Sequence, residues 1–490
     1  MPKLTFLWTD IFVYCLVAGI ILYGWRAART PALSKAWGSV ARTTSAMCAA
    51  LVLGAFLLIG LLDSIHYRPV IPPAPGQHTS QPVYSPVVRS ALDDVLSWSR
   101  LGSPEATYSA PLALRQFTKE TQIIDGRAVR DYPRLKHAGV ALIDENRHRR
   151  DILQRVAMGA AVALLAGALA ACLLTIWRLR SFRGSVRRAW RGWWCSESGV
   201  PWRAMWVTFC LMVLVVCIAW ALALDYHVLG TDRTGNDVLR QALKSVRTAL
   251  VIGTLTTLAM LPPALLFGIS AGYFKGRVDD VIQYIYTTLT SIPGVLLIAA
   301  CVLMMQVYID TNPELFPTVA ARADLRLFLL CLILGLTGWA GLCRLLRAET
   351  LKLRELEYVQ AARAFGVSHW RIMTRHLLPN VMHIVLITMV LEFSGLVLYE
   401  AVLSYLGIGV DPATPSFGTM IDSSRMEMSR DPMVWWNLLA AFLFMLALVL
   451  SANIFADAVQ TAFDPRTRRF RPQLKPRQPD GSVGVGGESS

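Results

Sequence analysis

Apolar residues in this chain gather in nine runs of about 20 residues, separated by polar stretches of unequal length. A helix of about 20 residues crosses the hydrocarbon core of a bilayer and makes all of its backbone hydrogen bonds internally. The pattern therefore predicts nine membrane-spanning helices. They are expected at 5–24, 44–62, 156–177, 204–224, 248–272, 282–307, 327–343, 381–398 and 436–456.

Composition agrees with an all-α polytopic membrane protein. Of the 490 residues, 54% are hydrophobic and only 17% are charged, whereas about a quarter of the residues in a soluble domain are charged. A cleaved signal peptide is the alternative for the first run, because Lys3 precedes it. Asp10 interrupts that run, and Arg26 and Arg29 follow it, so a retained helix is favoured.

Positive charge predicts the orientation. The loops at 25–43, 178–203, 273–281 and 344–380, with the residues after 456, carry far more Lys and Arg than the alternate loops. Such loops stay in the cytoplasm, so we expect the N-terminus outside and the C-terminus in the cytoplasm. Orientation and attraction to membrane lipid account for the net charge of +15, and no nucleic acid is expected as a partner.

The spacing of the runs divides the chain into four parts. Residues 1–177 form an N-terminal three-helix membrane unit, 178–203 a basic cytoplasmic linker, 204–466 a six-helix core, and 467–490 a disordered tail rich in Pro, Gly and Ser. The N-terminal unit includes a long outer loop, 63–155. It opens with a Pro-rich stretch, and its SALDDVLSWSRL segment is typical of helices. A small domain, a lid and a docking surface all remain open for this loop.

A polar segment, EYVQAARAFGVSHWRIMTRHLLPN at 357–380, separates two apolar runs. Residues 361–365 predict a short helix with small side chains, which Gly366 ends because glycine accepts the left-handed conformation. Ser368 is expected to N-cap a second helix, and Pro379 to break the chain before the next membrane helix. The alternative is an ordinary amphipathic connector lying on the membrane surface.

The order of Ala361-Ala362, Gly366, His376 and Leu378-Pro379 resembles the loop of ABC importer permease subunits that forms the coupling helix and sits in a groove of the ATPase. The usual pattern has Glu before the two alanines and Ile at the position of His376, whereas this chain has Gln360 and His376. The resemblance implies a role in ATPase coupling for Gln360, Ala361, Ala362, Gly366, His376, Leu378 and Pro379.

Four further stretches narrow the resemblance to dipeptide/oligopeptide-type permeases: HVLGTDRTGNDVL at 227–239, GYFKGRVDDVIQ at 272–283, LYEAVLSYLGIGVDPATPSFG at 398–418 and NIFADAVQTAFDPR at 453–466. The resemblance implies a six-helix type I core over 204–466 with its coupling loop at 344–380, preceded by three extra helices. It also implies an outer-loop signature of Gly230, Thr231, Asp232, Gly235 and Asp237.

The same resemblance implies the setting and the partners. These are a bacterial plasma (inner) membrane, a second permease subunit, two ATPase subunits and an extracytoplasmic solute-binding protein. The chain has no phosphate-binding P-loop, so ATP and Mg²⁺ are expected on the ATPase subunits. We expect neither catalysis, nor a metal, nor another cofactor in this chain. Its nine cysteines lack metal-binding or disulfide spacing and are expected to be small buried residues.

Two acidic residues are candidates for the solute path. Glu392 lies inside a predicted span, where a pathway role and a structural hydrogen bond are equally open. Glu400 is more consistent with a structural role, because the nearby Gly407 suggests a broken helix. In the outer loop, Asp232 and Asp237 either contact a delivery protein or, as we prefer, cap a helix beginning near Val238.

Other classes of function remain as alternatives. A stand-alone secondary transporter or channel would call for inverted repeats or several ionisable groups within the spans, and only Glu392 stands out. An intramembrane enzyme would need a nucleophile or metal motif, and the sequence contains no HExxH or GxSxG. Within the importer class, a non-peptide solute such as nickel is the alternative cargo.

Overall fold

The computed structural model describes residues 3–71, 84–124, 127–140, 142, 145–182, 200–312, 314 and 318–463. The predicted tail at 467–490, most of the basic linker and the Asp464-Pro465-Arg466 end of the core lie outside these ranges. Within them, helices dominate, as the sequence predicts. Two small sheets and four short helical turns complete the described structure.

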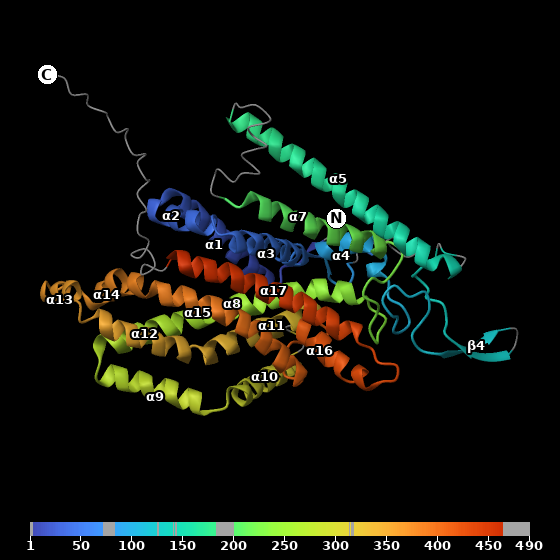
Figure 1. Cartoon of the computed structure of the whole chain (residues 1–490). Helices are drawn as coiled ribbons and strands as arrows, with labels where there is room; N and C mark the ends of the chain where they lie inside the picture. The colour runs from blue at the N-terminus through green and yellow to red at the C-terminus, as the bar shows by residue number, and fades with distance from the viewer. Residues whose placement is uncertain are drawn as a thin grey trace, which may run out of the picture.

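The described residues contain nine helical stretches long and apolar enough to cross a membrane, which confirms the predicted number. Figure 1 shows them running in one general direction, with α2, α13 and α14 at one end and the β4 hairpin at the other. Their elements are α1 (Trp8–Arg29), α3 (Thr44–Asp63), α5 (His148–Phe182), α7 (Trp202–Ala223), α8 (Val238–Phe274), α10 (Gly294–Thr311), α11 (Val319–Gly338) with α12 (Ala340–Leu353), α15 (Leu378–Tyr405) with the turns before it, and α17 (Trp436–Phe463).

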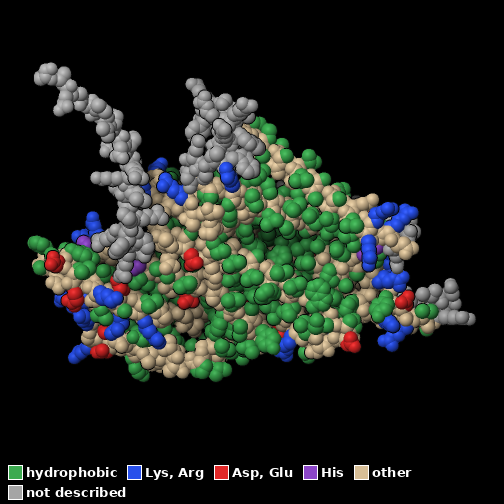
Figure 2. Space-filling view, viewed as in Figure 1, with side chains coloured by type: hydrophobic (Ala, Val, Ile, Leu, Met, Phe, Trp, Pro, Cys, Tyr) green, Lys and Arg blue, Asp and Glu red, His purple; other side chains and the backbone are tan. Residues whose placement is uncertain are grey.

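The surface carries the pattern of a membrane protein. Figure 2 shows a broad band of hydrophobic side chains over the middle of the molecule, with most visible charges gathered towards the two ends. Large apolar side chains on the membrane-spanning helices, such as Leu164, Val216 and Met304, are more than half exposed. Lipid tails solvate such a surface, whereas water would not.

Proline positions account for two differences from the predicted spans. The run at 282–307 is not one helix: it breaks at Ile292-Pro293 into α9 (Arg277–Ser291) and α10, because the residue before a proline favours extended backbone, and Ile292 has ψ 131°. The predicted break at Pro379 is wrong. Pro379 lies in the first turn of α15, where a missing N–H costs nothing, and a π-helical turn, η4 (Met373–Leu377), joins α14 (His369–Ile372) to α15.

Helix α8 lies at the centre of the fold and packs against α11, α12, α15, α3 and α17. It is longer than the predicted span at 248–272, and Pro262 and Pro263 are accommodated inside it. Helix α3 lies so close to α8 that a Cβ on Gly60 would be 2.9 Å from Leu250 Cδ1. Helix α5 pairs with α7, and α1 packs mainly against α11. The three N-terminal helices therefore lie against the core.

The segment between α3 and α5 folds into short elements at one end of the bundle. Strands β1 (Lys3–Leu4), β2 (His66–Arg68) and β3 (Arg89–Ser90) form an antiparallel sheet, and α4 (Ala91–Ser97) and η1 (Arg100–Gly102) confirm the helical prediction for SALDDVLSWSRL. Strands β4 (Glu120–Ile124) and β5 (Arg127–Asp131) form a hairpin, followed by η2 (Glu145–Arg147). We call residues 84–140 the outer insert. It adds strands that an all-α prediction lacked.

The remaining elements lie at the two ends of the helix bundle. Helix α2 (Pro31–Val40) packs against the end of α17, where the Trp37 ring lies 5.7 Å from the Phe463 ring. At the other end, α16 (Phe417–Arg425) and η5 (Glu427–Ser429) connect α15 to α17. Helix α13 (Glu357–Ala364) belongs to the polar segment.

Candidate functional site

The polar segment folds as the predicted helix, turn and helix. Helix α13 ends at Ala364, and Gly366 follows with φ 73°. Val367 N donates to Ala362 O at 3.1 Å, which closes the helix. A Cβ on Gly366 would meet no heavy atom within 4 Å, so backbone conformation alone favours glycine there. Ser368 holds the N-cap position of α14, but its side chain makes no capping hydrogen bond, contrary to expectation.

This segment is fixed to α8 and α12. Val359, Ile372 and Leu377 are buried in the cluster that α8 and α12 build. At the end of α8, the Tyr273 hydroxyl lies 2.8 Å from His369 Nδ1, and Arg354 donates to Tyr273 O at 2.6 Å. A displacement of the polar segment would therefore be transmitted to α8.

The residues that the resemblance assigned to coupling fall into two groups. Gln360, Ala361 and Pro379 are exposed, and Gln360 Nε2 donates to Glu355 O at 3.1 Å. Ala362 and Leu378 are partly buried against the core, while His376 is partly buried with its ring 6.3 Å from that of Tyr358.

Sequence reasoning missed the most exposed apolar groups of this segment. Phe365 is 87% exposed and Trp370 is 63% exposed, and the exposed Arg363, Arg371 and Arg375 lie on the same short segment. Large aromatic side chains with arginine beside them are the usual anchors of protein interfaces. Phe next to a turn glycine in an otherwise polar stretch was the available signal.

At the opposite end, the outer-loop signature folds into a turn that caps α8. Gly230 and Gly235 have φ 72° and 76°. Asp232 Oδ1 accepts hydrogen bonds from the backbone N–H groups of Thr234 and Asn236, both at 2.8 Å. Asp237 is the N-cap of α8 and accepts from Arg240 N at 3.0 Å, which confirms the predicted cap near Val238.

The outer insert lies directly on this signature. Glu105 N donates to Gly235 O at 2.9 Å, and Thr231 N donates to Ser109 O at 3.1 Å. A Cβ on Gly230 or Gly235 would overlap the backbone of the insert, so close approach also favours glycine at both positions. Thr231 is fully buried. Much of the signature is thus covered by this chain's own insert.

A buried histidine joins the two parts. His227 Nδ1 lies 2.8 Å from Asp237 Oδ2, and its Nε2 faces Glu105 Oε1 at 3.6 Å. Burial alone would lower the pKa of His227, but the carboxylates of Asp237 and Glu105 outweigh it and raise that pKa to about 9. Burial would raise the pKa of Glu105, but His227 and two backbone N–H groups lower it to about 2.

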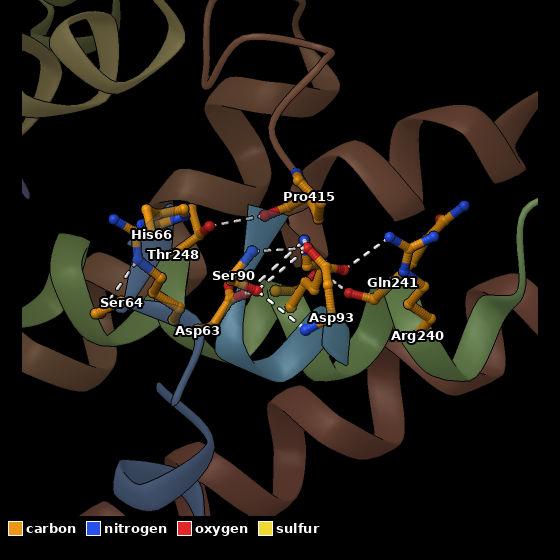
Figure 3. A network of polar contacts seen from close by, with 12 residues as sticks. Asp63, Ser64, His66, Ser90, Asp93, Arg240, Gln241, Thr248 and Pro415 are labelled. Carbon is orange, nitrogen blue, oxygen red and sulfur yellow. Dashed lines mark hydrogen bonds and ion pairs between the residues drawn. The ribbon is translucent and has the colours of Figure 1, made fainter. Parts of the chain in front are cut away.

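A second polar network fastens α4 of the insert to α8 and α3 (Figure 3). Asp93 accepts from Arg240 at 2.7 Å and from Lys244 at 2.8 Å, and Ser90 Oγ donates to Asp63 at 2.7 Å. Burial opposes ionisation of Asp93, yet Lys244 and Arg240 hold the pKa of its carboxyl well below its usual range. The insert is therefore held to α8 through charged groups at two places.

A third network lies among membrane helices and was missed by sequence reasoning. Arg247 of α8 donates to Asp10 of α1 at 2.6 Å and to Ser64 Oγ at 3.2 Å. Asp324 of α11 faces the same guanidinium at 3.6 Å and accepts from Thr9 N at 3.1 Å. Asp10, Arg247 and Asp324 are all buried. Burial in a membrane requires such pairing.

The two candidate acids differ in their surroundings. Glu400 is 1% exposed and accepts from Ser404 Oγ at 2.7 Å and Ser416 Oγ at 2.8 Å, so it joins α15 to the start of α16. Gly407, with φ 76°, ends α15. Glu392 is half-buried in α15, and among the described residues its carboxylate has no hydrogen-bond or ion-pair partner.

Comparison with known proteins agrees with this architecture. Residues 264–469 match the family model described as "Binding-protein-dependent transport system inner membrane component". The oligopeptide transport system permease protein OppC of Mycobacterium bovis is 33% identical over 245 residues, covering 50% of this chain and 78% of that protein. The dipeptide transport system permease protein DppC of Lactococcus lactis is 28% identical over 49% of this chain and 64% of its own length.

A peptidoglycan transport system permease protein, YejE of Agrobacterium fabrum, is 35% identical over 50% of this chain and 58% of its own length. The nine candidate spans of the described residues define a multi-pass membrane protein, and the family match makes it an inner-membrane transport component. The chain belongs to the binding-protein-dependent transport inner-membrane component family, whose members are the non-catalytic membrane subunits of ABC importers. The chain spans about two thirds of the length of the curated relatives it matches, and half of it lies outside these matches.

Proposed function

We propose that this chain is the permease subunit of an ATP-driven importer of peptides or peptide-like solutes. It assembles with a second permease subunit, with two ATPase subunits that hold ATP and Mg²⁺, and with an extracytoplasmic solute-binding protein. Relatives named for oligopeptide, dipeptide and peptidoglycan transport support this class of cargo.

The observation that carries the proposal is the exposed pair Phe365 and Trp370 on a segment fixed to α8. These aromatic side chains fit a groove of an ATPase subunit, with the neighbouring arginines at its rim. Since Tyr273 and Arg354 connect the segment to α8, closure of the ATPases would move that helix as a rigid body. Residues 360–362, 366, 376, 378 and 379 shape and support this contact.

The proposed orientation places α2, α13 and α14 in the cytoplasm and the outer insert on the other side. The N-terminus is then outside and the C-terminus inside. The excess of Lys and Arg in the loops at the first end supports this, and Figure 1 has the polar segment and the insert at opposite ends.

We assign Glu392 to the solute path, because an unpaired carboxylate within a span needs a polar environment. Its charge would attract the ammonium group of a peptide as it crosses. Glu400 instead supports the path by holding the α15–α16 turn.

Reconstitution tests the proposal. The chain is expressed with its candidate partner permease and ATPases, purified, and placed in vesicles, where peptide uptake is expected only with the binding protein outside and ATP inside. Phe365→Asp should abolish association with the ATPases. Trp98→Asp, a matched change at an aromatic residue that is 83% exposed and directly follows α4, should leave it intact. Uptake by this chain without any ATPase would overturn the proposal.

A further inference from the structure

The outer insert presents a surface rich in positive charge. Exposed basic side chains lie on the β4–β5 hairpin and at its base; they are Arg115, Lys119, Arg130, Arg134 and Lys136, which we call the basic face. Figure 2 shows Lys and Arg side chains gathered at this end of the molecule. The inference below rests on the proposed function, because it concerns a partner of the same importer.

The fold builds this face by strand alternation. The chain after β5 stays paired with the segment before β4. The backbones of Arg115 and Arg134 form an antiparallel β-bridge, and Leu135 N donates to Leu114 O at 2.9 Å. Pro133 and Leu135 point inward and are buried, whereas Arg134 and Lys136 alternate with them on the outside. Arg134 and Lys136 are therefore held on the outer side of an ordered backbone.

The two exposed acidic residues of the described hairpin, Glu120 and Asp131, do not balance these five basic side chains. Asp131 pairs with Arg115 at 3.5 Å, and Lys119 lies over the Tyr132 ring at 5.3 Å. Among the described residues, Arg130 and Lys136 have no carboxylate partner. Like charges held close together repel one another, and an anionic partner would relieve that repulsion.

We propose that the basic face is a docking surface for an acidic face of the solute-binding protein. The anionic membrane surface is the competing partner, and the geometry disfavours it. Figure 1 shows the hairpin projecting beyond the ends of the membrane helices, away from the bilayer that they cross. Arg149 and Arg150 instead lie in the first turn of α5, at the end of a candidate membrane span.

A partner bound at the basic face would be linked to the core through Glu105 and His227. The backbone N–H groups of Lys136 and His137 donate to Glu105 at 2.9 and 2.7 Å. Glu105 faces His227, and His227 bonds to Asp237, the N-cap of α8. A partner bound at the basic face is thus connected to α8, whose other end contacts the polar segment through Tyr273 and His369.

The test measures binding of the solute-binding protein that restores uptake to the reconstituted complex. The full complex in nanodiscs carries either Arg130→Glu with Lys136→Glu, or the control Arg149→Glu with Arg150→Glu. We expect the first variant to slow association about tenfold at low salt, with the difference shrinking at high salt, because charges at an interface rim act mainly on association. The control should match the unmodified complex.

Equal association rates for the first variant and the unmodified complex would overturn the inference. It would also be overturned if that variant lost binding to vesicles of anionic lipid while its binding to the solute-binding protein stayed unchanged. Basal ATP hydrolysis separates the two proposals: an unmodified complex that hydrolyses ATP and imports peptide, but ignores the charge reversal, refutes only the docking surface. A chain that associates with no ATPase refutes the proposed function.

Discussion

Arg247 in α8 and Asp10 in α1 form a buried ion pair at 2.6 Å, although 237 positions separate them in the sequence. Removing Asp10 takes from the buried Arg247 its nearest carboxylate and leaves Asp324, 3.6 Å away, as its acidic neighbour. Breaking a buried pair in this way costs about 3–5 kcal/mol. We expect Asp10→Ala to lower the thermal stability of the purified protein strongly. Replacing all three charged residues, as Asp10→Leu with Arg247→Met and Asp324→Asn, should recover much of the loss, because no carboxylate of this network then faces a missing guanidinium.

The same variant tests how α1 is held to the core, because the Asp10–Arg247 pair is one of its buried polar contacts, beside the hydrogen bond from Thr9 N to Asp324. Limited proteolysis of Asp10→Ala should cleave near α1 before the rest of the chain. If Asp10→Ala unfolds at the same temperature as the unmodified protein, the pair does not hold α1 to the core.

Gly366 and Gly407 offer a matched pair of substitutions. Both have positive φ, and a Cβ at either position would meet no heavy atom within 4 Å. Alanine should therefore cost each turn about 1 kcal/mol through backbone strain alone. Only Gly366→Ala should reduce peptide uptake per ATP hydrolysed, by about fivefold, because only that turn lies in the polar segment that we propose contacts the ATPase. Equal transport defects in the two variants would argue against a special role for the polar segment.

The buried His227 predicts a pH dependence of insert attachment. Its pKa is raised from 6.5 to about 9, so its stabilisation is complete below pH 6.5 and is lost as the pH rises through 9. The pKa of Glu105 is lowered from 4.5 to about 2, so its contribution is present above pH 4.5 and is lost as the pH falls through 2. Attachment should be strongest between these limits.

We therefore expect the thermal stability of the purified protein to fall between pH 6.5 and 9, by on the order of 3 kcal/mol. The protection of the backbone amides of residues 103–117 against hydrogen exchange should fall over the same pH range. His227→Gln should be less stable and should lose most of this dependence. A histidine variant that keeps the full pH dependence would contradict the assignment.

Substitutions of the two glutamates of α15 should affect thermal stability and peptide uptake differently. Glu400→Ala removes the acceptor of two buried hydroxyl groups, so we expect a loss of about 2–3 kcal/mol in thermal stability. Glu392→Gln removes no interaction with a described residue, so stability should stay within about 0.5 kcal/mol of the unmodified protein. Uptake of peptides should nevertheless fall. A Glu392→Gln protein with unchanged uptake would remove this residue from the solute path.

Local features of the fold were predictable from the sequence. The nine spans follow from run length and hydropathy, the Gly366 turn from the conformational freedom of glycine, and the Asp237 cap from its position before an apolar-periodic stretch. Each depends on residues within one or two helical turns. The predicted span at 282–307 was continuous, whereas the helix breaks at Ile292-Pro293. Hydropathy does not register a missing backbone donor.

Long-range features were not predictable. No local pattern pairs Asp10 with Arg247, or brings Glu105 against Gly235, since both contacts depend on how distant segments pack. At Pro379 the sequence predicted a break that the structure does not have. Proline disrupts the interior of a helix, but the first turn of a helix tolerates it, and the preceding π-helical turn keeps the chain helical. The family pattern does not cover the outer insert, so the sequence predicted only that part of it is helical.

The central claim is that the polar segment contacts an ATPase subunit through Phe365. A photo-crosslinking phenylalanine analogue placed at position 365 in the assembled complex tests it directly, with the analogue at position 98 as the control at the opposite end. The account predicts a covalent product with an ATPase subunit from position 365 and none from position 98. A complex that imports peptide yet crosslinks to an ATPase only from position 98, or from neither position, would contradict it.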